Sequence, residues 1–399
     1  MTICHERETI MKMPWMLKTA LITAVCCGAA LAGSTGLASF VVTNDDVPAP
    51  FTSSATFYAV NADGSLGAKT TVPTGGSGIG GGFFAAARAI VMPNGADACV
   101  YVSDAGSGDI AGIDAMTHTV TGNFYGFSSD SGASNGIGLA ANAQYLYATY
   151  SASTTIGTFQ VQAGCTLTFV SDIAAAGLNG GTADGMAIHG NIMIVTYGDG
   201  SIESFDISGG VPVSNGDQQN STGAGDDHLP NSVVITQDGH YAIFGDSSTK
   251  TNVEVSDISS GKLTPTVSYY LGTAWNSGSV QLSPDEKFLF VANDSSGQIT
   301  AAYFDHVTGK VYKGCTSDSL KGFYTKFAYV GSVGFELSSG AGGKIYVPEF
   351  GGGGKSFLGL LDLAGSGASC TLTESANSPV ANPGNNSFML SIAAYPAAQ

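Results

Sequence analysis

The feature that most constrains this chain is a short apolar segment that recurs seven times. Each copy runs into a polar turn, as FLFVAND does at residues 288–294. Repeats spaced by 40 to 60 residues are typical of modular arrays rather than of a single sandwich. Aligned positions in the seven copies, separated by 46 to 60 residues, are Val42, Val102, Ala148, Val195, Phe244, Val291 and Val347.

Other short strands complete each unit. An apolar strand precedes six of the copies, whereas the first copy, FVVTND, has no such strand before it. A strand of the same form appears near the C-terminus as SFMLSIAAYP, around Ile392. Third and fourth strands follow turns rich in glycine, which allows tight turns. The chain contains 56 glycines. The pattern predicts an all-β fold, a seven-bladed β-propeller over residues 33–399, with its ring closed by a C-terminal strand that completes the N-terminal blade.

The N-terminus has the form of an export signal. Lys12 and Lys18 precede the apolar run LITAVCCGAALA, which ends at the small-residue site Ala30-Leu31-Ala32. A run of about a dozen residues is too short to span a bilayer, and no later segment is long enough. We therefore expect residues 1–32 to be a signal peptide, no transmembrane segment after its cleavage, and a secreted or periplasmic protein.

Four cysteines remain after the predicted cleavage, an even number in a compartment where disulfides persist. They form no CxxC or CxxCH motif, which excludes a c-type haem and a thioredoxin-like centre by spacing. Three pairings are possible, and the strand map favours Cys99 with Cys165 and Cys315 with Cys370.

Charge and loop composition limit the partners. The formal net charge of -17 repels phosphate backbones and anionic lipid, so we expect no nucleic-acid partner. The acidic loops DAGSGD and GDGSIESFD do not match the twelve-residue calcium pattern, and GSGIGG does not precede a dinucleotide-binding helix. We therefore expect a monomer with no cofactor and no metal, and a small-molecule ligand or substrate at the central channel.

The repeat units also resemble a known family. Units with SPD or QDG turns, an LFVAN-type strand and a D-x-x-TGK turn resemble the seven-bladed lactonase propellers, the 6-phosphogluconolactonase-like group, and the related YVTN-type repeat proteins. The resemblance covers residues 39–396 and is strongest in 228–313. It implies hydrolysis of a sugar lactone or similar cyclic ester at the channel mouth by a His, a Glu and Arg residues.

Three matching positions differ from that set. Asn231 stands where the family has His, Ser279 where it has Glu, and Asp294 where it often has Arg. An Asn cannot accept a proton at neutral pH. Whether the protein is an enzyme is therefore open: the alternative to a lactonase-type hydrolase is a non-catalytic extracytoplasmic propeller that binds a ligand or a protein, and a surface-associated repeat protein is a third interpretation.

Candidate site residues lie in loops predicted to face the channel mouth. His228 follows two aspartates in GAGDDHLP and is the candidate acid or base, because a neighbouring carboxylate raises the pKa of an imidazole and orients its ring. Arg88 is the candidate catalytic cation, since the mature chain has few positively charged residues. The candidate ligand-binding residues are Asp184, Asp227, Asn231, Asn276 and Asn385.

The strand map places two further groups of polar residues. Second strands end at polar residues that we expect to form an acidic rim on the mouth side: Asn44, Asp104, Asp246, Asn293 and Glu349. Three histidines, His118, His240 and His306, fall in tight turns, and His189 ends an inner strand at the opposite face.

Overall fold

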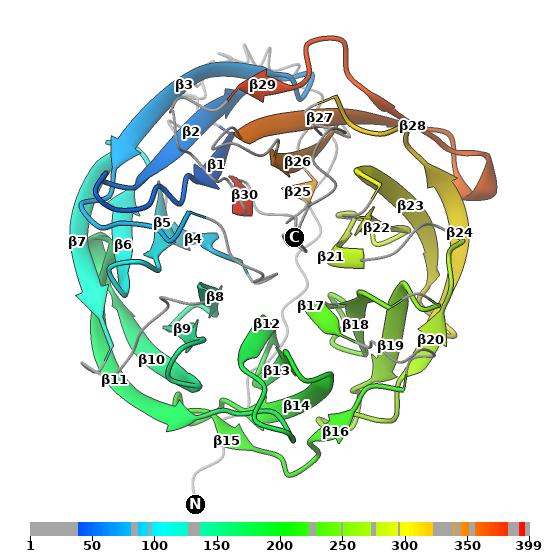
Figure 1. The fold of residues 1–399 in the computed structure, drawn as a ribbon, viewed down its shortest axis with the longest axis horizontal. Helices are drawn as coiled ribbons and strands as arrows, with labels where there is room; N and C mark the ends of the chain where they lie inside the picture. The colour runs from blue at the N-terminus through cyan, green and yellow to red at the C-terminus, as the bar shows by residue number, and fades with distance from the viewer. Residues whose placement is uncertain are drawn as a thin grey trace, which may run out of the picture. The chain divides into compact units, whose positions relative to one another are not determined.

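The repeat folds into seven antiparallel sheets that surround a common axis (Figure 1). The computed structural model describes residues 39–80, 87–94, 97–126, 136–222, 229–248, 250–272, 277–293, 296–321, 338–339, 344–350, 356–381 and 391–395. The predicted seven-bladed β-propeller is confirmed. In each blade the first strand lies nearest the axis and the fourth lies outermost.

The first three blades have four strands each. Blade 1 comprises β30 (Ser391–Tyr395), β1 (Phe40–Asn44), β2 (Ser54–Val60) and β3 (Leu66–Pro73). Blade 2 comprises β4 (Ala89–Asn94), β5 (Asp97–Asp104), β6 (Asp109–Asp114) and β7 (Thr119–Tyr125). Blade 3 comprises β8 (Ile137–Ala141), β9 (Tyr145–Tyr150), β10 (Thr155–Gln162) and β11 (Thr166–Ala174), with the short 3₁₀ helix η1 (Ala163–Cys165) between the last two.

The other four blades follow in the same order. Blade 4 comprises β12 (Ala183–His189), β13 (Ile192–Tyr197), β14 (Ser201–Asp206), β15 (Val213–Ser214) and β16 (Gln219–Asn220). Blade 5 comprises β17 (Pro230–Ile235), β18 (Tyr241–Asp246), β19 (Val253–Asp257) and β20 (Val267–Tyr269); blade 6 comprises β21 (Ser277–Leu282), β22 (Phe288–Asn293), β23 (Gln298–Asp305) and β24 (Lys310–Thr316). Blade 7 comprises β25 (Ser338–Ser339), β26 (Lys344–Phe350), β27 (Ser356–Ala364), β28 (Thr371–Glu374) and β29 (Val380–Ala381), with η3 (Gly367–Ser369) before β28.

Burial explains why the second strands are the clearest copies of the repeat. All six residues of β22, FLFVAN, are buried, because both faces of a middle strand are covered by neighbouring blades. An outer strand such as β3 is mostly exposed instead. In the described part of the chain, the buried apolar side chains form seven clusters, each shared by two adjacent blades. The core is thus a ring of interfaces between blades, and no blade buries its apolar faces alone.

The ring closes as the sequence predicted. Strand β1 pairs with the C-terminal β30 from Phe40↔Tyr395 to Asn44↔Ser391. The rings of Phe40 and Tyr395 stack with centroids 5.4 Å apart. Val41 of β1 and Ile392 of β30 enter the cluster that joins blade 7 to blade 1, so closure buries apolar surface as well as pairing backbones.

Two disulfides also join neighbouring blades. Cys99 on β5 is bonded to Cys165 at the end of η1, which links blades 2 and 3. Cys315 on β24 is bonded to Cys370 before β28, which links blades 6 and 7. Both favoured pairings are confirmed. In the described part of the chain, no helix has the length and apolar character needed to cross a membrane.

Candidate functional site

The alternating strand directions give the propeller two faces. The upper face carries the loops from a fourth strand to the next blade and the turns between second and third strands. The lower face carries the remaining turns. Of the predicted site residues, Arg88, Asp184 and Asn231 lie at the upper ends of the first strands, whereas His228, Asp227, Asn276 and Asn385 lie outside the described residues.

Arg88 is fully buried and ties blade 1 to blade 2. Its Nη1 lies 3.3 Å from Oδ2 of Asp46, which is also fully buried. Its backbone N–H donates to Oγ of Ser391 at 2.8 Å, and its carbonyl accepts a bond from Nδ2 of Asn44 at 3.2 Å. Removing one partner of such a pair leaves a buried charge, which costs about 3–5 kcal/mol. The predicted contact of Arg88 with substrate stays a prediction; its contacts here join β1, β4 and β30.

Asp184 lies at the start of β12, where an irregular register between Ala183 and Met186 interrupts the pairing with β13. Asp184 is only 7% exposed, and the Oγ1 hydroxyl of Thr182 donates a hydrogen bond to its Oδ1 at 3.3 Å. Burial raises the pKa of the Asp184 carboxyl to about 7; the Thr182 hydroxyl opposes this rise and the charge of Asp199 adds to it. A carboxyl that titrates near neutral pH suits general acid–base catalysis.

Asp199, in the turn between β13 and β14, is the contrasting carboxylate. It accepts the backbone N–H of Asn179 at 2.6 Å and the hydroxyl of Ser201 at 2.6 Å. Partial burial acts to raise the pKa of Asp199, but these bonds outweigh it and hold the pKa below its ordinary value. Two neighbouring carboxyls with pKa values pushed apart are the arrangement that divides acid and base roles in enzymes.

The backbone carbonyl of Asn231 is held against Gly185, the residue after Asp184, by the contact between blades 4 and 5. Oγ1 of Thr196 accepts the N–H of Gly185 at 2.7 Å and donates to the carbonyl of Asn231 at 3.2 Å. A Cβ on Gly185 would lie 2.5 Å from that carbonyl oxygen, so the close approach requires glycine. The first strands β12 and β17 therefore present Asp184 and Asn231 on adjacent blades.

The sequence signal for Asp199 was present but ambiguous. It lies in GDGS, a composition that any hairpin turn can have, and the sequence suggested only a weak likeness to a calcium loop. What distinguishes it is the neighbouring Asp184, a residue from a different strand. The sequence alone gives no indication that these two carboxyls influence each other.

The prediction of an exposed acidic rim is wrong, because the ends of the second strands are buried. Asp104 is 1% exposed, and burial raises its pKa to about 7; the hydroxyls of Thr74 and Ser53 oppose that rise, and the charges of Asp109 and Asp46 add to it. The linker of residues 74–80 covers this strand end: a Cβ on Gly76 would lie 2.5 Å from Oδ2 of Asp104. The five predicted rim residues are all at most 1% exposed: Asn44, Asp104, Asp246, Asn293 and Glu349.

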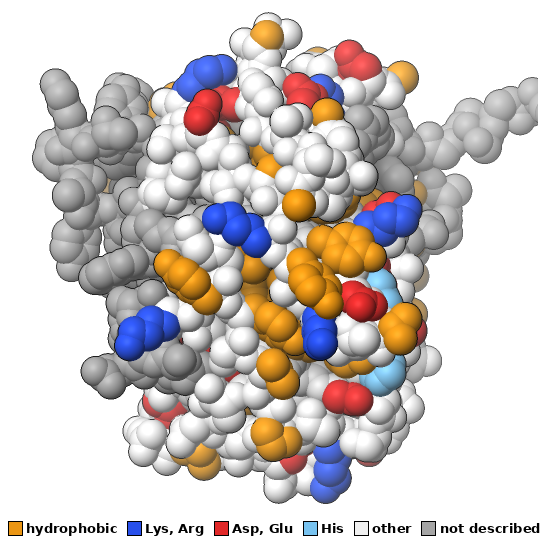
Figure 2. Space-filling model, turned by 90° about the vertical axis from the view of Figure 1, so that its right-hand side faces the viewer, with side chains coloured by type: hydrophobic (Ala, Val, Ile, Leu, Met, Phe, Trp, Pro, Cys, Tyr) orange, Lys and Arg blue, Asp and Glu red, His pale blue; other side chains and the backbone are white. Residues whose placement is uncertain are grey.

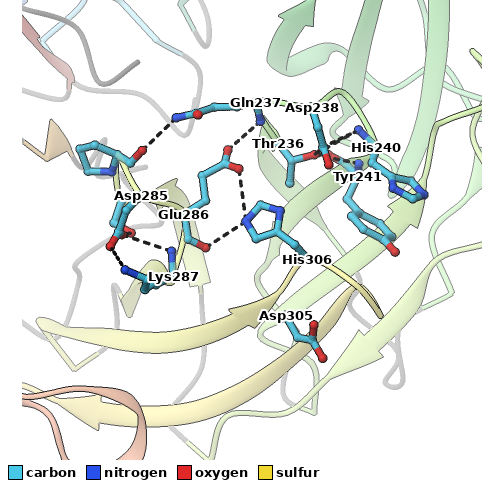
Figure 3. Close-up of polar contacts among 12 residues, drawn as sticks. Thr236, Gln237, Asp238, His240, Tyr241, Asp285, Glu286, Lys287, Asp305 and His306 are labelled. Carbon is cyan, nitrogen blue, oxygen red and sulfur yellow. Dashed lines mark hydrogen bonds and ion pairs between the residues drawn. The ribbon is translucent and has the colours of Figure 1, made fainter.

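The lower face carries histidines in its turns, as expected. Figure 3 shows His306 against Glu286, with Nε2 3.2 Å from Oε2. Oε1 of Glu286 accepts the backbone N–H of Gln237 at 2.7 Å, which links the turns of blades 5 and 6. His189 extends the link to blade 4 through a 2.8 Å contact between Nε2 and the Gln237 carbonyl. We call Gln237, Glu286 and His306 the lower latch.

A cavity of about 200 Å³ adjoins the lower latch. Its apolar wall comes from Val233, Ile235 and Leu282, and its polar wall includes Gln237 and Glu286. These polar groups already bond to one another, as described for the latch. Within the described ranges, no group of three or more His, Cys, Asp or Glu residues is placed to hold a metal ion.

Known proteins match this chain in structure but not in sequence. No protein-family model matches it, and no curated protein matches it in sequence. A structure described as a "putative 6-phosphogluconolactonase" from Bacteroides fragilis NCTC 9343 aligns with a TM-score of 0.65 at 12% identity, covering 90% of this chain and 98% of its own. A structure from Bacteroides uniformis ATCC 8492 with the same description gives the same TM-score and identity, covering 90% and 100%.

A third match is described as a periplasmic protein. The periplasmic gluconolactonase of Pseudomonas aeruginosa aligns with a TM-score of 0.51 at 16% identity, covering 69% of this chain and 80% of its own. At such identities the similarity concerns the fold and not the chemistry. The chain therefore has the β-propeller fold of structures described as lactonases, as its sequence resemblance implied.

Proposed function

We propose that the protein hydrolyses a sugar lactone or a similar small cyclic ester at the upper face, with Asp184 as the general base. The observation that carries this proposal is the buried Asp184 carboxyl, whose pKa is raised to about 7 beside the ionised Asp199. A base works best when its pKa lies near the working pH. The lactonase descriptions of the matching structures support the same reaction class.

The proposed reaction adds one water molecule to one lactone. Ionised Asp184 accepts a proton from water, and the water oxygen attacks the lactone carbonyl carbon. The side-chain amide of Asn231, on the adjacent first strand, donates to the oxyanion of the tetrahedral intermediate. The ring C–O bond then breaks, and the leaving oxygen takes a proton, from Asp184 or from the predicted acid His228. The product is the open-chain hydroxy acid.

A non-catalytic binding propeller is the second candidate. It is favoured by the residues at two positions where the family that the sequence resembles has proton-transferring groups, because the side chains of Asn231 and Ser279 do not exchange a proton at neutral pH. In this case the upper face would bind a sugar-like ligand and release it unchanged.

We also propose that the protein is a monomer that works outside the cytoplasm after loss of residues 1–32. Two disulfides support the location outside the cytoplasm, because such bonds persist in oxidising compartments. N-terminal sequencing of the protein recovered from its native host would test the cleavage before Gly33. Sedimentation of the same material would test the oligomeric state.

The deciding experiment measures hydrolysis of a panel of sugar and aliphatic lactones by the wild type, Asp184→Asn and Asp104→Asn. Asp104 is the matched control, because its pKa is also raised to about 7 but it lies between blades 1 and 2. We expect Asp184→Asn to lose about 10²–10⁴-fold in rate and Asp104→Asn to keep it. No hydrolysis above buffer by the wild type would refute the hydrolase. A rise in the unfolding midpoint with the lactone, without turnover, would then identify the binding propeller.

A further inference from the structure

The cavity beside the lower latch is bounded by the first strands of blades 4, 5 and 6. Ala187 on β12, Val233 on β17 and Leu282 on β21 belong to its apolar wall. Gln237 at its polar side is exposed, and Ala187 is only partly buried, so solvent reaches the cavity from the lower face. Its volume of about 200 Å³ is sufficient for a small ring, since an engineered cavity of about 150 Å³ binds benzene.

Glu286 stands where the equivalent turn of blade 5 has a glycine. In both turns this residue donates its N–H to the carbonyl three residues earlier, Gly239 to Thr236 and Glu286 to Ser283, each at 2.8 Å. Both residues have a left-handed backbone, with φ of 69° and 51°. That conformation costs free energy for a residue with a Cβ and little for glycine, and such positions concentrate at functional sites. The Glu286 side chain therefore has a role that the turn itself does not require.

The Glu286 carboxyl is turned into the protein beside the cavity (Figure 3). Its side chain is only 9% exposed, and its two oxygens face the Gln237 N–H and Nε2 of His306. Burial raises the pKa of this carboxyl above its ordinary value, although both partners oppose the rise. These partners therefore do not fully replace water around the charged form. A carboxylate has about four acceptor positions, so each oxygen can accept a further donor from a ligand.

The charges around the cavity favour a cation. Within the described part of the chain, the residues that line it include Glu286 but no lysine or arginine. Three titratable side chains from other turns influence Glu286: Asp238, His189 and His306. The histidines carry a charge only when protonated, and the exposed Lys287 is paired with Asp285 at 2.9 Å outside the cavity. Figure 2 shows histidine side chains beside acidic ones at one edge of the molecule, and the formal charge of -17 attracts cations to the whole chain.

We propose that this cavity binds a small organic cation, a protonated amine with a compact apolar body. The ammonium group donates a hydrogen bond to the Glu286 carboxylate, and the apolar body packs against Val233 and Leu282. An anion would be repelled by Glu286, and an uncharged apolar molecule would cover the carboxylate without replacing its water. The site lies at the opposite face from Asp184 and does not depend on the proposed lactone reaction.

Methyl NMR titrations of the full protein at pH 8 test this with probes of matched shape: benzylamine, benzyl alcohol and benzoate. We expect benzylamine to shift the methyl signals of Val233 and Leu282. It should bind at least about tenfold tighter than benzyl alcohol, because hydrogen bonds to charged groups are the stronger ones. Benzoate should not bind. Glu286→Gln keeps an acceptor for the Gln237 N–H, and it should lose at least about tenfold in affinity for benzylamine but little for benzyl alcohol.

The matched control is Asp285→Asn, which removes the same charge from the neighbouring residue outside the cavity and should bind benzylamine as the wild type does. Ala187→Leu narrows the cavity and should weaken both benzylamine and benzyl alcohol. Equal affinity for the amine and the alcohol, tighter binding of benzoate, or lining methyl signals that benzylamine does not shift would overturn the proposal. An equal loss in Asp285→Asn would also overturn it, because the charge of the surface rather than Glu286 would then attract the amine. Thermal unfolding of each variant distinguishes a lost site from a lost fold.

Discussion

Aspartates on the two faces of this propeller behave in opposite ways. On the lower face, Asp206 and Asp257 are the last residues of third strands. They accept hydrogen bonds from Ser208 and Ser259, two residues later in the chain, which hold their pKa values below the ordinary range. On the upper face, burial raises the pKa of Asp104 and Asp184 to about 7. The residue type is the same, and the loops that cover it decide its chemistry.

The comparison shows how to find a site in a fold with many acidic turns. An aspartate that caps its own turn is stabilised as an anion and contributes to the turn geometry. An aspartate buried at a strand end, with few donors, retains its proton near neutral pH and can exchange it. Blades 2 and 4 each contain one of the latter, and both lie near other carboxylates: Asp104 near Asp109 and Asp46, and Asp184 near Asp199.

The largest expected effect is on the pH dependence of lactone hydrolysis. Because Asp184 must be ionised to act as a base and its pKa is about 7, the rate should rise about tenfold per pH unit below pH 7 and level off above it. Initial rates between pH 5 and 9 check this. Any residual activity of Asp184→Asn should lack the rise. A wild-type profile that is flat across pH 7 would contradict the assignment.

The next effect is on stability, through Asp104. Its folded pKa of about 7 exceeds its unfolded value, so its contribution is fully present below pH 4 and is lost as the pH rises through 7. Asp104→Asn should therefore stabilise the protein at pH 8, by up to about 4 kcal/mol, and change little near pH 4. Urea unfolding at both pH values measures this. Equal shifts at the two pH values would show that the carboxyl is not protonated when buried.

A smaller effect should come from the lower latch. Glu286→Gln keeps an acceptor for the Gln237 N–H but removes the charge that faces His306. A double-mutant cycle with His306→Gln should give a coupling energy of about 1 kcal/mol at low salt, and less at high salt, because the histidine is partly exposed. Strictly additive variants would mean that the contact contributes nothing to stability.

The smallest effect should come from a turn aspartate. Asp257→Asn keeps an oxygen for the Ser259 N–H and loses only the exposed contact with His240, which lies 3.3 Å away. The unfolding midpoint should move less than in any variant above, at pH 5 and at pH 8 alike. A shift as large as that of Asp104→Asn would remove the distinction between the two faces.

The blades could be predicted because their signal is local. The apolar second strands are buried on both faces, so each reads as a continuous apolar run, and the missing partner of FVVTND pointed directly to the strand around Ile392. The disulfide pairing followed from the same map. Because the same strand order repeats in all seven blades, the clear copy in blade 6 predicts the strands of the other blades.

The site could be predicted only in part, because burial at strand ends depends on loops from other blades. The sequence predicts that Asp104 is a rim residue, but the linker around Gly76 covers it. Asp199 looked like an ordinary turn residue, since its relation to Asp184 crosses between strands. Arg88 was singled out for its rarity, and its partner Asp46 lies 42 residues earlier in a neighbouring blade.

The pairing of β1 with β30 has a consequence for the order of synthesis. Blade 1 is begun by the first described strand and finished by the last, so every other blade emerges from the ribosome before it can be completed. Throughout translation the apolar Val41 and Val42 lack one of their covering strands. A nascent chain that stopped before Ser391 would carry an open ring with a bare edge at each end, a form prone to pair with other chains.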